Sequence, residues 1–426
     1  MNEVNKIKNE RAILVSVKTS NVSREKVSEY LEELEMLAET AGAETIFKVV
    51  QERGRPDSAS FIGKGKAEEI AELVELNDIN LLIFDDDLTP TQVRNLERII
   101  DRKIIDRSGL ILDIFASHAK TNQAKTQVEL AQLQYLLPRL TRAWTHLSKQ
   151  HGGIGTKGPG ETQIETDRRL IRTRIAKLKE KLKKIELQQI TSGQKRKNFI
   201  SAALVGYTNA GKSTLLNRLT NADVLTENKL FATLDSTTRA FELSKNKKLL
   251  LSDTVGFIRK LPHHLVESFK TTLNVVRDAD IILHVVDINY PFFEEHIGVV
   301  QSTLNELNCE EKKQIIIFNK VDALNDNHKI AYVKNLFPDS LLVSAERGIN
   351  IQQLIEKLIE AYENNFVENT VTLHVSESKI ISRIHSLSEI LNTKYVDENV
   401  ILNYRTSSLN ANKIESLLNG KKENHT

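Results

Sequence analysis

Eight consecutive residues near the middle of the chain have the types and spacing of a phosphate-binding loop. They match the pattern G-x-x-x-x-G-K-[ST] and are Gly206, Tyr207, Thr208, Asn209, Ala210, Gly211, Lys212 and Ser213. Backbone N–H groups of such a loop surround phosphates, the lysine places a charge on the outer phosphates, and the Ser213 hydroxyl suits Mg²⁺. The loop alone leaves three classes open: a kinase, an ATPase and a GTPase.

A second motif further along the chain could hold the metal and the terminal phosphate. It consists of Asp253, Thr254, Val255 and Gly256, directly after a strand-like segment. An aspartate at the end of a strand can hold Mg²⁺, and the Gly256 N–H can meet a γ-phosphate. We therefore expect Lys212 and Gly256 to make the catalytic contacts to the transferred phosphoryl group.

Two more motifs point to the base of the nucleotide. One is Asn319, Lys320, Val321 and Asp322, and the other is Ser344, Ala345 and Glu346. Guanine presents two adjacent N–H donors and adenine does not, so the two carboxylate oxygens of Asp322 favour guanine. A backbone N–H of the last motif could hold the guanine carbonyl. All four motifs follow predicted strands, at the edge where open parallel sheets bind ligands, and they predict a guanine-nucleotide site.

The segment between the first two motifs contains candidates for a further metal ligand. In GTPases a threonine of this mobile segment completes the Mg²⁺ shell only while the γ-phosphate is present. Thr233, Thr237 and Thr238 are all chemically able to do so. The residue types alone therefore leave the choice open.

Family resemblance narrows that choice. The segment F-A-T-L-D is formed by Phe231, Ala232, Thr233, Leu234 and Asp235. With G-Y-T-N-A-G-K-S-T and D-T-V-G-F, it resembles the HflX family of translation-factor-related GTPases. The resemblance continues through F-I-G-K-G-K, F-D-D-D-L-T-P-T-Q, D-R-S-G-L-I-L-D-I-F and G-G-I-G-T-K-G-P-G-E, over residues 1–365. It implies that Thr233 is the metal ligand and that F-A-T-L-D belongs to the nucleotide site.

The resemblance also carries expectations about activity and partners. It implies Mg²⁺-dependent hydrolysis of GTP to GDP, binding to the large ribosomal subunit and its rRNA, and splitting or rescue of stalled ribosomes. An alternative is an RNA-remodelling or ribosome-assembly factor with an ATP site in its N-terminal domain and a regulatory GTPase switch. Nucleotide dependence separates the two, because subunit binding should follow the GTP state.

Phe257 stands where Ras-like enzymes place a glutamine that orients the attacking water. Its side chain can neither donate nor accept a conventional hydrogen bond. We therefore expect slow hydrolysis by the free protein and stimulation by a partner; the alternative is another residue of this chain that takes over the task.

Composition limits the remaining possibilities. A chain of 426 residues suggests about two to four domains. The single cysteine, Cys309, excludes an intrachain disulfide and fits a reducing cytosol. Neither a signal peptide nor an apolar run of membrane-spanning length is visible. We expect a cytoplasmic monomer without an integral membrane segment, and peripheral membrane association stays open.

The net charge of +2 conceals a strongly basic region. Residues 139–184 hold thirteen Lys/Arg against four Asp/Glu, and many of the bases fall on a helix predicted over 164–185. Its isoleucines and leucines recur in steps of four and three, as in a coiled coil, and a helix over 123–149 could be the antiparallel partner. The glycine-rich residues 151–160 would form a mobile tip. The alternative is an ordinary solvated helix surface. Because the charges on this helix are nearly all positive, we favour binding to a polyanion, here ribosomal RNA.

These patterns predict an α/β protein with four parts. They are an α/β N-terminal domain (1–106), the helical coiled-coil hairpin (107–196), a P-loop GTPase domain with a mostly parallel sheet and helices on both faces (197–365), and a small α/β C-terminal domain (366–426). In the first domain, Gly63–Lys66 is a weak candidate for a second, ATP-binding site, and Asp85–Asp87 is expected to be an acidic turn before a helix capped by Thr89. In the last domain, a helix is predicted over Lys379–Asn392.

Overall fold

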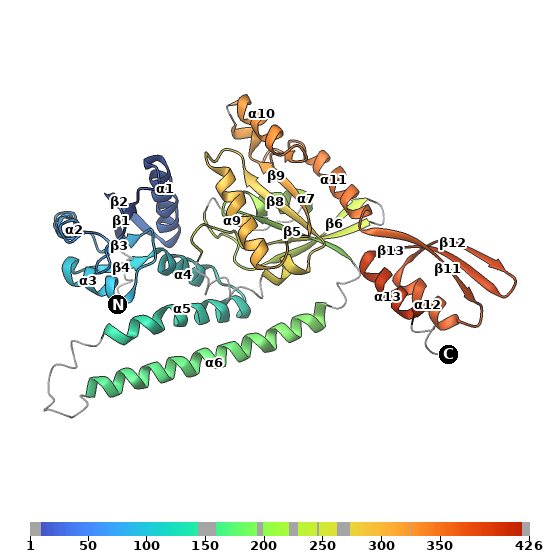
Figure 1. Ribbon diagram of the computed structural model, residues 1–426, viewed down its shortest axis with the longest axis horizontal. Helices are drawn as coiled ribbons and strands as arrows, with labels where there is room; N and C mark the ends of the chain where they lie inside the picture. The colour runs from blue at the N-terminus through green and yellow to red at the C-terminus, as the bar shows by residue number, and fades with distance from the viewer. Residues whose placement is uncertain are drawn as a thin grey trace, which may run out of the picture.

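The computed structural model describes residues 10–143, 159–193, 199–220, 229–244, 247–261, 273–324 and 326–419. Within these residues the chain forms three separate sheets, and two long helices run beside the first two (Figure 1). The predicted α/β class is confirmed. No helix in the described ranges is long and apolar enough to cross a membrane.

The N-terminal domain is a parallel sheet covered by helices on both faces. Its strands, in spatial order, are β2 (Ala43–Glu52), β1 (Glu10–Lys18), β3 (Leu81–Phe84) and β4 (Lys103–Asp106). One face packs against α1 (Arg24–Ala41) and α4 (Arg107–His118), and the other against α2 (Lys64–Leu76) and α3 (Pro90–Ile100). Because both faces are covered, the central strands are continuous apolar runs such as β3, Leu-Leu-Ile-Phe.

Two local details of this domain bear on the sequence predictions. Thr89 caps α3 in a capping box with Gln92, as expected for the turn after the acidic run. Helix α4 shares the core of this domain, with Leu110 and Phe115 buried beside residues of α1. The sequence prediction ended the N-terminal domain at residue 106 and therefore placed α4 in the hairpin.

The hairpin consists of α5 (Asn122–Ala143) and α6 (Pro159–Gly193), which lie side by side (Figure 1). The predicted seam faces α5: Leu178 is buried, and Ile171, Ile175, Leu182 and Ile185 are half-buried. Most of the expected tip, residues 151–158, lies outside the described residues. Helix α6 already begins at Pro159, so the last two residues of the expected tip are helical.

The central domain holds a six-stranded sheet in the order β10-β9-β8-β5-β7-β6. Its strands are β5 (Ile200–Gly206), β6 (Thr237–Ser244), β7 (Lys247–Asp253), β8 (Ile281–Asp287), β9 (Lys313–Asn319) and β10 (Leu341–Leu342). Among these described strands, β6, at one edge, is the one that runs antiparallel to its neighbour. Helices α7 (Lys212–Thr220) and α11 (Ile351–Glu363) pack on one face, and α9 (Phe293–Glu306) and α10 (Asn327–Leu336) on the other.

The C-terminal domain is a three-stranded antiparallel sheet with two helices. In chain order its elements are β11 (Phe366–His374), α12 (Ser378–Leu387), β12 (Glu389–Val396), β13 (Asn399–Ser407) and α13 (Ser408–Asn419), and β13 is central. The helix predicted over Lys379–Asn392 is wrong at its end. It stops at Leu387, and the next residues form β12 because they pair with β13.

Candidate functional site

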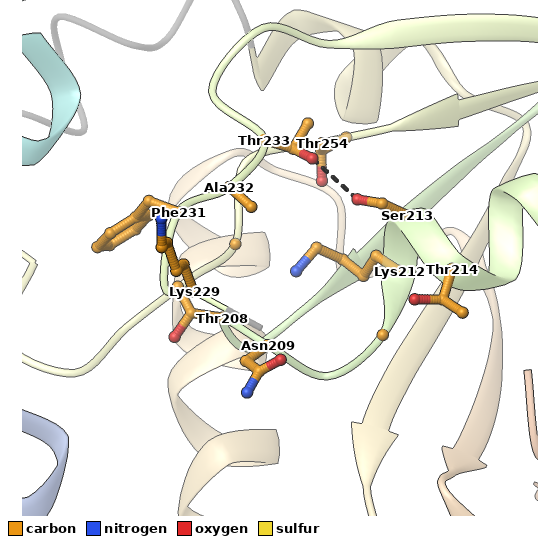
Figure 2. A pocket seen from close by; sticks show the side chains of 12 residues that line it. Thr208, Asn209, Lys212, Ser213, Thr214, Lys229, Phe231, Ala232, Thr233 and Thr254 are labelled. Atoms are coloured by element: carbon orange, nitrogen blue, oxygen red, sulfur yellow. Dashed lines mark hydrogen bonds between the residues drawn. The ribbon is translucent and has the colours of Figure 1, made fainter. Parts of the chain in front are cut away.

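The phosphate loop lies between β5 and α7, at the carboxyl edge of the central sheet (Figure 2). Gly206 and Gly211 have φ angles of 155° and 91°. A Cβ on Gly206 would come within 2.2 Å of the Val285 carbonyl oxygen, and one on Gly211 within 2.2 Å of the Asn319 amide nitrogen. Both positions therefore need glycine, because β8 and β9 approach the loop so closely.

Lys212 points into this loop and is buried, although no carboxylate of the described residues is bonded to it. Its Nζ donates to the carbonyl oxygens of Gly206 (3.2 Å) and Tyr207 (2.8 Å). Burial lowers the pKa of Lys212 to about 8, and the nearby Asp253 only partly opposes that shift. A desolvated cation held by carbonyls is suited to receive an anion, here the outer phosphates.

Three side-chain oxygens converge beside Lys212. The Ser213 hydroxyl lies 2.8 Å from the Thr233 hydroxyl and donates to the Asp253 carboxylate (Figure 2). Burial raises the pKa of Asp253, while Lys212 and the hydroxyl hydrogen bonds oppose that shift. A set of only oxygen donors, one of them anionic, fits a hard divalent cation such as Mg²⁺. Thr233 is the residue for which the family resemblance implied this role.

The base-recognition motifs meet where β9 and β10 end. The Asn319 side chain donates to the Ala210 carbonyl and accepts from the Ala345 N–H, both at 2.9 Å, and so ties the phosphate loop to the last motif. Arg218 of α7 holds that motif through the Ala345 and Glu346 carbonyls. Asp322 is largely buried, and Arg347 lies 3.4 Å from its carboxylate. The predicted base and phosphate contacts therefore share one edge of the sheet.

Phe257 follows the second motif, and its side chain faces away from the pocket. Its backbone bridges to the phosphate loop, since Phe257 N donates to the Gly206 carbonyl and Thr208 N donates to the Phe257 carbonyl at 2.8 Å. The ring is 2% exposed and packs in a core cluster with Val205 and Val276. Phe257, at the position where Ras-like enzymes have the glutamine, therefore packs in the hydrophobic core here.

The segment Phe231–Asp235 contacts other domains as well as the pocket. Thr233 faces Ser213, whereas Phe231 packs edge-on against Phe115 of α4, with ring centroids 4.7 Å apart. The Asp235 carboxylate accepts from the Lys120 and Thr121 N–H groups and from the Thr121 hydroxyl, directly before α5. Its carboxylate therefore contacts the base of the hairpin, a contact that no sequence motif indicated.

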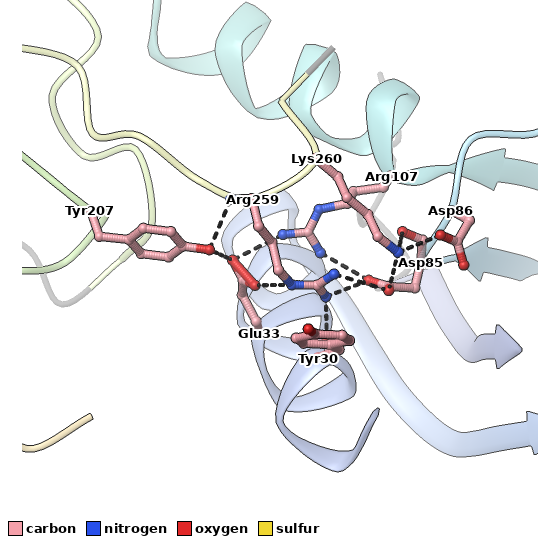
Figure 3. A network of polar contacts seen from close by, with 8 residues as sticks. All are labelled: Tyr30, Glu33, Asp85, Asp86, Arg107, Tyr207, Arg259 and Lys260. Carbon is pink, nitrogen blue, oxygen red and sulfur yellow. Dashed lines mark hydrogen bonds and ion pairs between the residues drawn. The ribbon is translucent and has the colours of Figure 1, made fainter. Parts of the chain in front are cut away.

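A polar network joins the N-terminal domain to the two phosphate motifs (Figure 3). Its members are Tyr30, Glu33, Asp85, Asp86, Arg107, Tyr207, Arg259 and Lys260. Arg107 is 1% exposed and pairs with Glu33 and Asp85, each at 2.9 Å. Arg259, two residues after Phe257, pairs with the same two carboxylates at 2.8 Å. Burial alone would raise the pKa of Asp85, but the surrounding cations hold it below its usual value.

Tyr207 shows how the loop takes part in this network. Its backbone belongs to the phosphate loop, but its hydroxyl donates to Glu33 at 2.7 Å and accepts from the Arg259 N–H at 2.9 Å. Its ring stacks on His296 with centroids 3.6 Å apart. Tyr207 was expected among the nucleotide contacts. Only its main chain is available for that role, because its side chain contacts the N-terminal domain.

The weak second-site candidate, Gly63–Lys66, forms the start of α2. Lys64 and Lys66 pair with glutamates one turn along their own helix, Glu68 and Glu69. These pairs favour a solvated helix start over an anion site.

This arrangement is that of a P-loop GTPase. It combines a phosphate loop that needs glycine at two positions, a buried lysine, converging side-chain oxygens and guanine-recognition motifs at the same edge of the sheet. Three family models match the chain in order: "GTP-binding GTPase N-terminal" over residues 28–116, "GTP-binding GTPase Middle Region" over 118–196 and "50S ribosome-binding GTPase" over 201–320. The "GTPase HflX" of Flavobacterium psychrophilum is 56% identical over 314 residues, 74% of this chain and 76% of that protein.

The "GTPase HflX" of Escherichia coli is 43% identical over 384 residues, 89% of each chain. The chain therefore belongs to the GTPase HflX family, as its motifs indicated, and it is a GTPase. A solved structure, a GTP-binding protein from the archaeon Sulfolobus solfataricus in complex with GDP, is 26% identical. It covers 83% of this chain and 98% of its own, with a TM-score of 0.45.

Proposed function

We propose that this GTPase binds the large ribosomal subunit through the α5–α6 hairpin and splits or rescues stalled ribosomes in the cytoplasm, acting as a monomer. The description of the matching family model, a 50S ribosome-binding GTPase, supports the partner. The observation that carries the proposal is the charge on α6. The basic residues of α6 form one exposed surface, because the apolar residues of this helix face α5 and its lysines and arginines face outward.

The exposed face of α6 has cations that no carboxylate neutralises. Arg174 pairs with Glu129 of α5, and Lys184 pairs with Glu180. In the described part of the chain, Arg169, Arg172, Lys177, Lys179 and Lys183 are exposed without a carboxylate in ion-pair distance. A row of unpaired cations on a projecting helix suits the phosphates of ribosomal RNA.

We further propose roles for the pocket residues. Lys212, Gly256 and the phosphate loop contact the phosphates of GTP, Asp322 and Ala345 contact guanine, and Ser213 and Thr233 hold Mg²⁺. When bound, Mg²⁺ neutralises charge that develops between the β- and γ-phosphates. Since Phe257 cannot orient water, basal hydrolysis is slow and the ribosome is the activator.

The test measures GTP turnover and co-sedimentation with purified large subunits, in GTP analogue, GDP and ATP. In the test variant, Arg169, Arg172 and Lys177 become glutamate. In the matched control, three exposed bases off the hairpin, Arg98, Lys313 and Lys334, become glutamate. We expect the hairpin variant to lose subunit binding and stimulation while keeping its basal rate, and the control variant to behave like the parent.

Salt dependence gives an independent measurement. With only about six RNA phosphate contacts, subunit affinity should fall roughly a thousandfold between about 50 and 200 mM salt. Stimulation that survives the hairpin reversal, or an affinity that does not respond to salt, would exclude the hairpin as the docking element.

A further inference from the structure

Arg218, in the last turn of α7, holds the loop that follows β10. Its Nε donates to the Ala345 carbonyl at 2.9 Å, and its Nη2 donates to the Glu346 carbonyl. Gly348 of the same loop, with a φ of 74°, lies next to the guanidinium, because a Cβ there would be 3.8 Å from the Arg218 Cζ. One side chain thus binds two successive carbonyls of the motif that was expected to meet the base.

Most backbone N–H groups of this loop already have acceptors. The Ala345 N–H donates to the Asn319 side chain at 2.9 Å, and the Arg347 N–H donates to the Ser344 hydroxyl at 3.0 Å. Three further N–H groups bond to main-chain carbonyls within the loop, and they belong to Ser344, Gly348 and Ile349. Among the described residues, Glu346 is the member of this loop whose N–H makes no hydrogen bond.

The geometry of the peptide bond decides where this free N–H points. The Ala345 carbonyl and the Glu346 N–H belong to one planar trans peptide unit, so they point in opposite directions. Because Arg218 binds the carbonyl from the side of α7, the N–H is directed to the other side of the loop. Asp322 borders the same loop, since the Arg347 Nε lies 3.4 Å from its carboxylate. The free donor and the carboxylate expected to read guanine therefore belong to one corner of the site.

We propose that Arg218 is a positioning residue for guanine recognition: by holding two carbonyls, it turns the Glu346 N–H toward the carbonyl oxygen of guanine. This inference rests on the proposed guanine site. It refines the contact there, because the Ala345 N–H is engaged by Asn319 and the Glu346 N–H is available. Asp322 reads the two N–H donors of guanine, and the loop held by Arg218 reads its carbonyl oxygen.

An arginine at this place can also act on stability alone, since a cation near the last turn of a helix is favourable. The two roles differ in how they treat different bases. A stabilising arginine affects all nucleotides alike, whereas a positioning arginine affects those whose carbonyl oxygen is a good acceptor.

Two analogues of GDP separate these roles. The thioguanine analogue keeps both N–H donors of guanine but replaces the carbonyl oxygen by sulfur, a weak acceptor. IDP is complementary, because its base keeps the carbonyl oxygen and lacks the exocyclic amino group.

The decisive variant is Arg218→Ala, tested by equilibrium binding of GDP and the two analogues without ribosomes. The parent should prefer GDP over the thioguanine analogue by roughly tenfold, the value of one hydrogen bond between uncharged groups. We expect the variant to bind GDP about tenfold more weakly and to retain that preference only within about twofold. The preference for GDP over IDP should change by less than about twofold, because Asp322 still reads the amino group.

Two further variants complete the experiment. Arg218→Lys keeps the positive charge but has no planar fork for two carbonyls, and it should prefer GDP over the thioguanine analogue by about threefold. Arg239→Ala removes an exposed arginine of β6 in the same domain and should bind all three diphosphates like the parent. Thermal unfolding of the nucleotide-free proteins separates a loss of affinity from a loss of fold. If Arg218→Ala unfolds, the lysine variant decides by the same two preferences.

The inference is overturned if the variants of Arg218 keep the parental preference for GDP over the thioguanine analogue, or if they weaken all three diphosphates by one factor. It is also overturned if the parent binds GDP and the thioguanine analogue equally well. Failure of the guanine site itself gives another pattern, in which the parent does not distinguish GDP from IDP and Asp322→Asn binds GDP as the parent does.

Discussion

The nucleotide pocket and the interface with the N-terminal domain are built in different ways from the same stretch of chain. The pocket is made by short loops whose backbone is fixed by glycine and by Asn319. The interface is made by side chains far apart in sequence, such as Glu33 and Arg259, which are 226 positions apart. Tyr207 belongs to both, through its main chain in one and its side chain in the other.

The interface and the pocket also differ in how their buried cations are paired. In the interface, Arg107 and Arg259 each have two carboxylates within ion-pair distance. In the pocket, Lys212 is bonded to carbonyl oxygens alone among the residues that the structure describes, and burial lowers its pKa to about 8. A neutralised cation indicates docking within the protein, whereas a buried and weakly paired one indicates a site for an external anion.

The largest effect expected from this comparison is on catalysis. Lys212→Ala should lower GTP hydrolysis by at least about a thousandfold, because the outer phosphates lose their buried cation. The free energy of unfolding should stay equal or rise, since a poorly paired buried charge is removed. Turnover and denaturant unfolding measure the two quantities, with Lys334→Ala as a surface control. A large loss of stability would mean that Lys212 is a structural cation like those of the interface.

The reverse pattern is expected for the interface. Arg107→Ala should lower the free energy of unfolding by about 3–5 kcal/mol, because it removes one buried partner of Glu33 and Asp85. Arg98→Ala, on the exposed side of α3, should change it by less than about 0.5 kcal/mol. Urea unfolding of both variants, with the parent alongside, makes the comparison. Equal effects of the two changes would contradict a strongly coupled interface.

The choice of nucleotide base should depend on Asp322 in the pocket and not on the interface. Asp322→Asn should weaken GTP binding roughly a hundredfold and favour xanthine nucleotides, since the carboxylate no longer accepts from both guanine donors. Competition between GTP and XTP, measured on the parent and the variant, reports the change. An unaltered preference for GTP would assign the base contact to another residue.

The smallest effect is the pH dependence of nucleotide affinity. The pKa of Lys212 is about 8, so this lysine loses its proton as the pH rises through that value. An anion binds the protonated form better, and affinity for GTP should therefore fall about tenfold between pH 7 and pH 9. Lys212→Arg, whose cation does not titrate in this range, should flatten the curve. The same slope in both proteins would locate the titrating group elsewhere.

The sequence predicted the pocket better than it predicted the interface, for a physical reason. Phosphate loops are local: the identity of Gly211 or Lys212 already specifies what the backbone must do. Asp85 and Arg107 lie in segments that carried the family resemblance, but no local pattern indicated that they pair with each other or with Glu33. The packing of α1, β3 and α4 brings the three together. The acidic turn was recognised as a helix start, yet its role as partner of Arg259 and Lys260 was not.

The same reasoning explains the error at β12. Ile390 and Leu391 continue the apolar residues of α12 at a spacing that suits a helix. The strand forms because β13 offers a pairing partner, with Tyr395 opposite Val400 and Thr393 opposite Leu402. Long-range pairing of this kind is invisible in a local pattern and overrides it.

The contact between Asp235 and Thr121 connects the segment that holds Thr233 to the start of the hairpin. Thr233, the proposed ligand of Mg²⁺, lies two positions before Asp235, whose carboxylate accepts from the Lys120 and Thr121 N–H groups directly before α5. If GTP orders this segment, the start of α5 gains its acceptor, and the free energy involved is shared in both directions. A partner that holds the start of α5 would then also favour the GTP-bound form, and hairpin docking and nucleotide retention would change together.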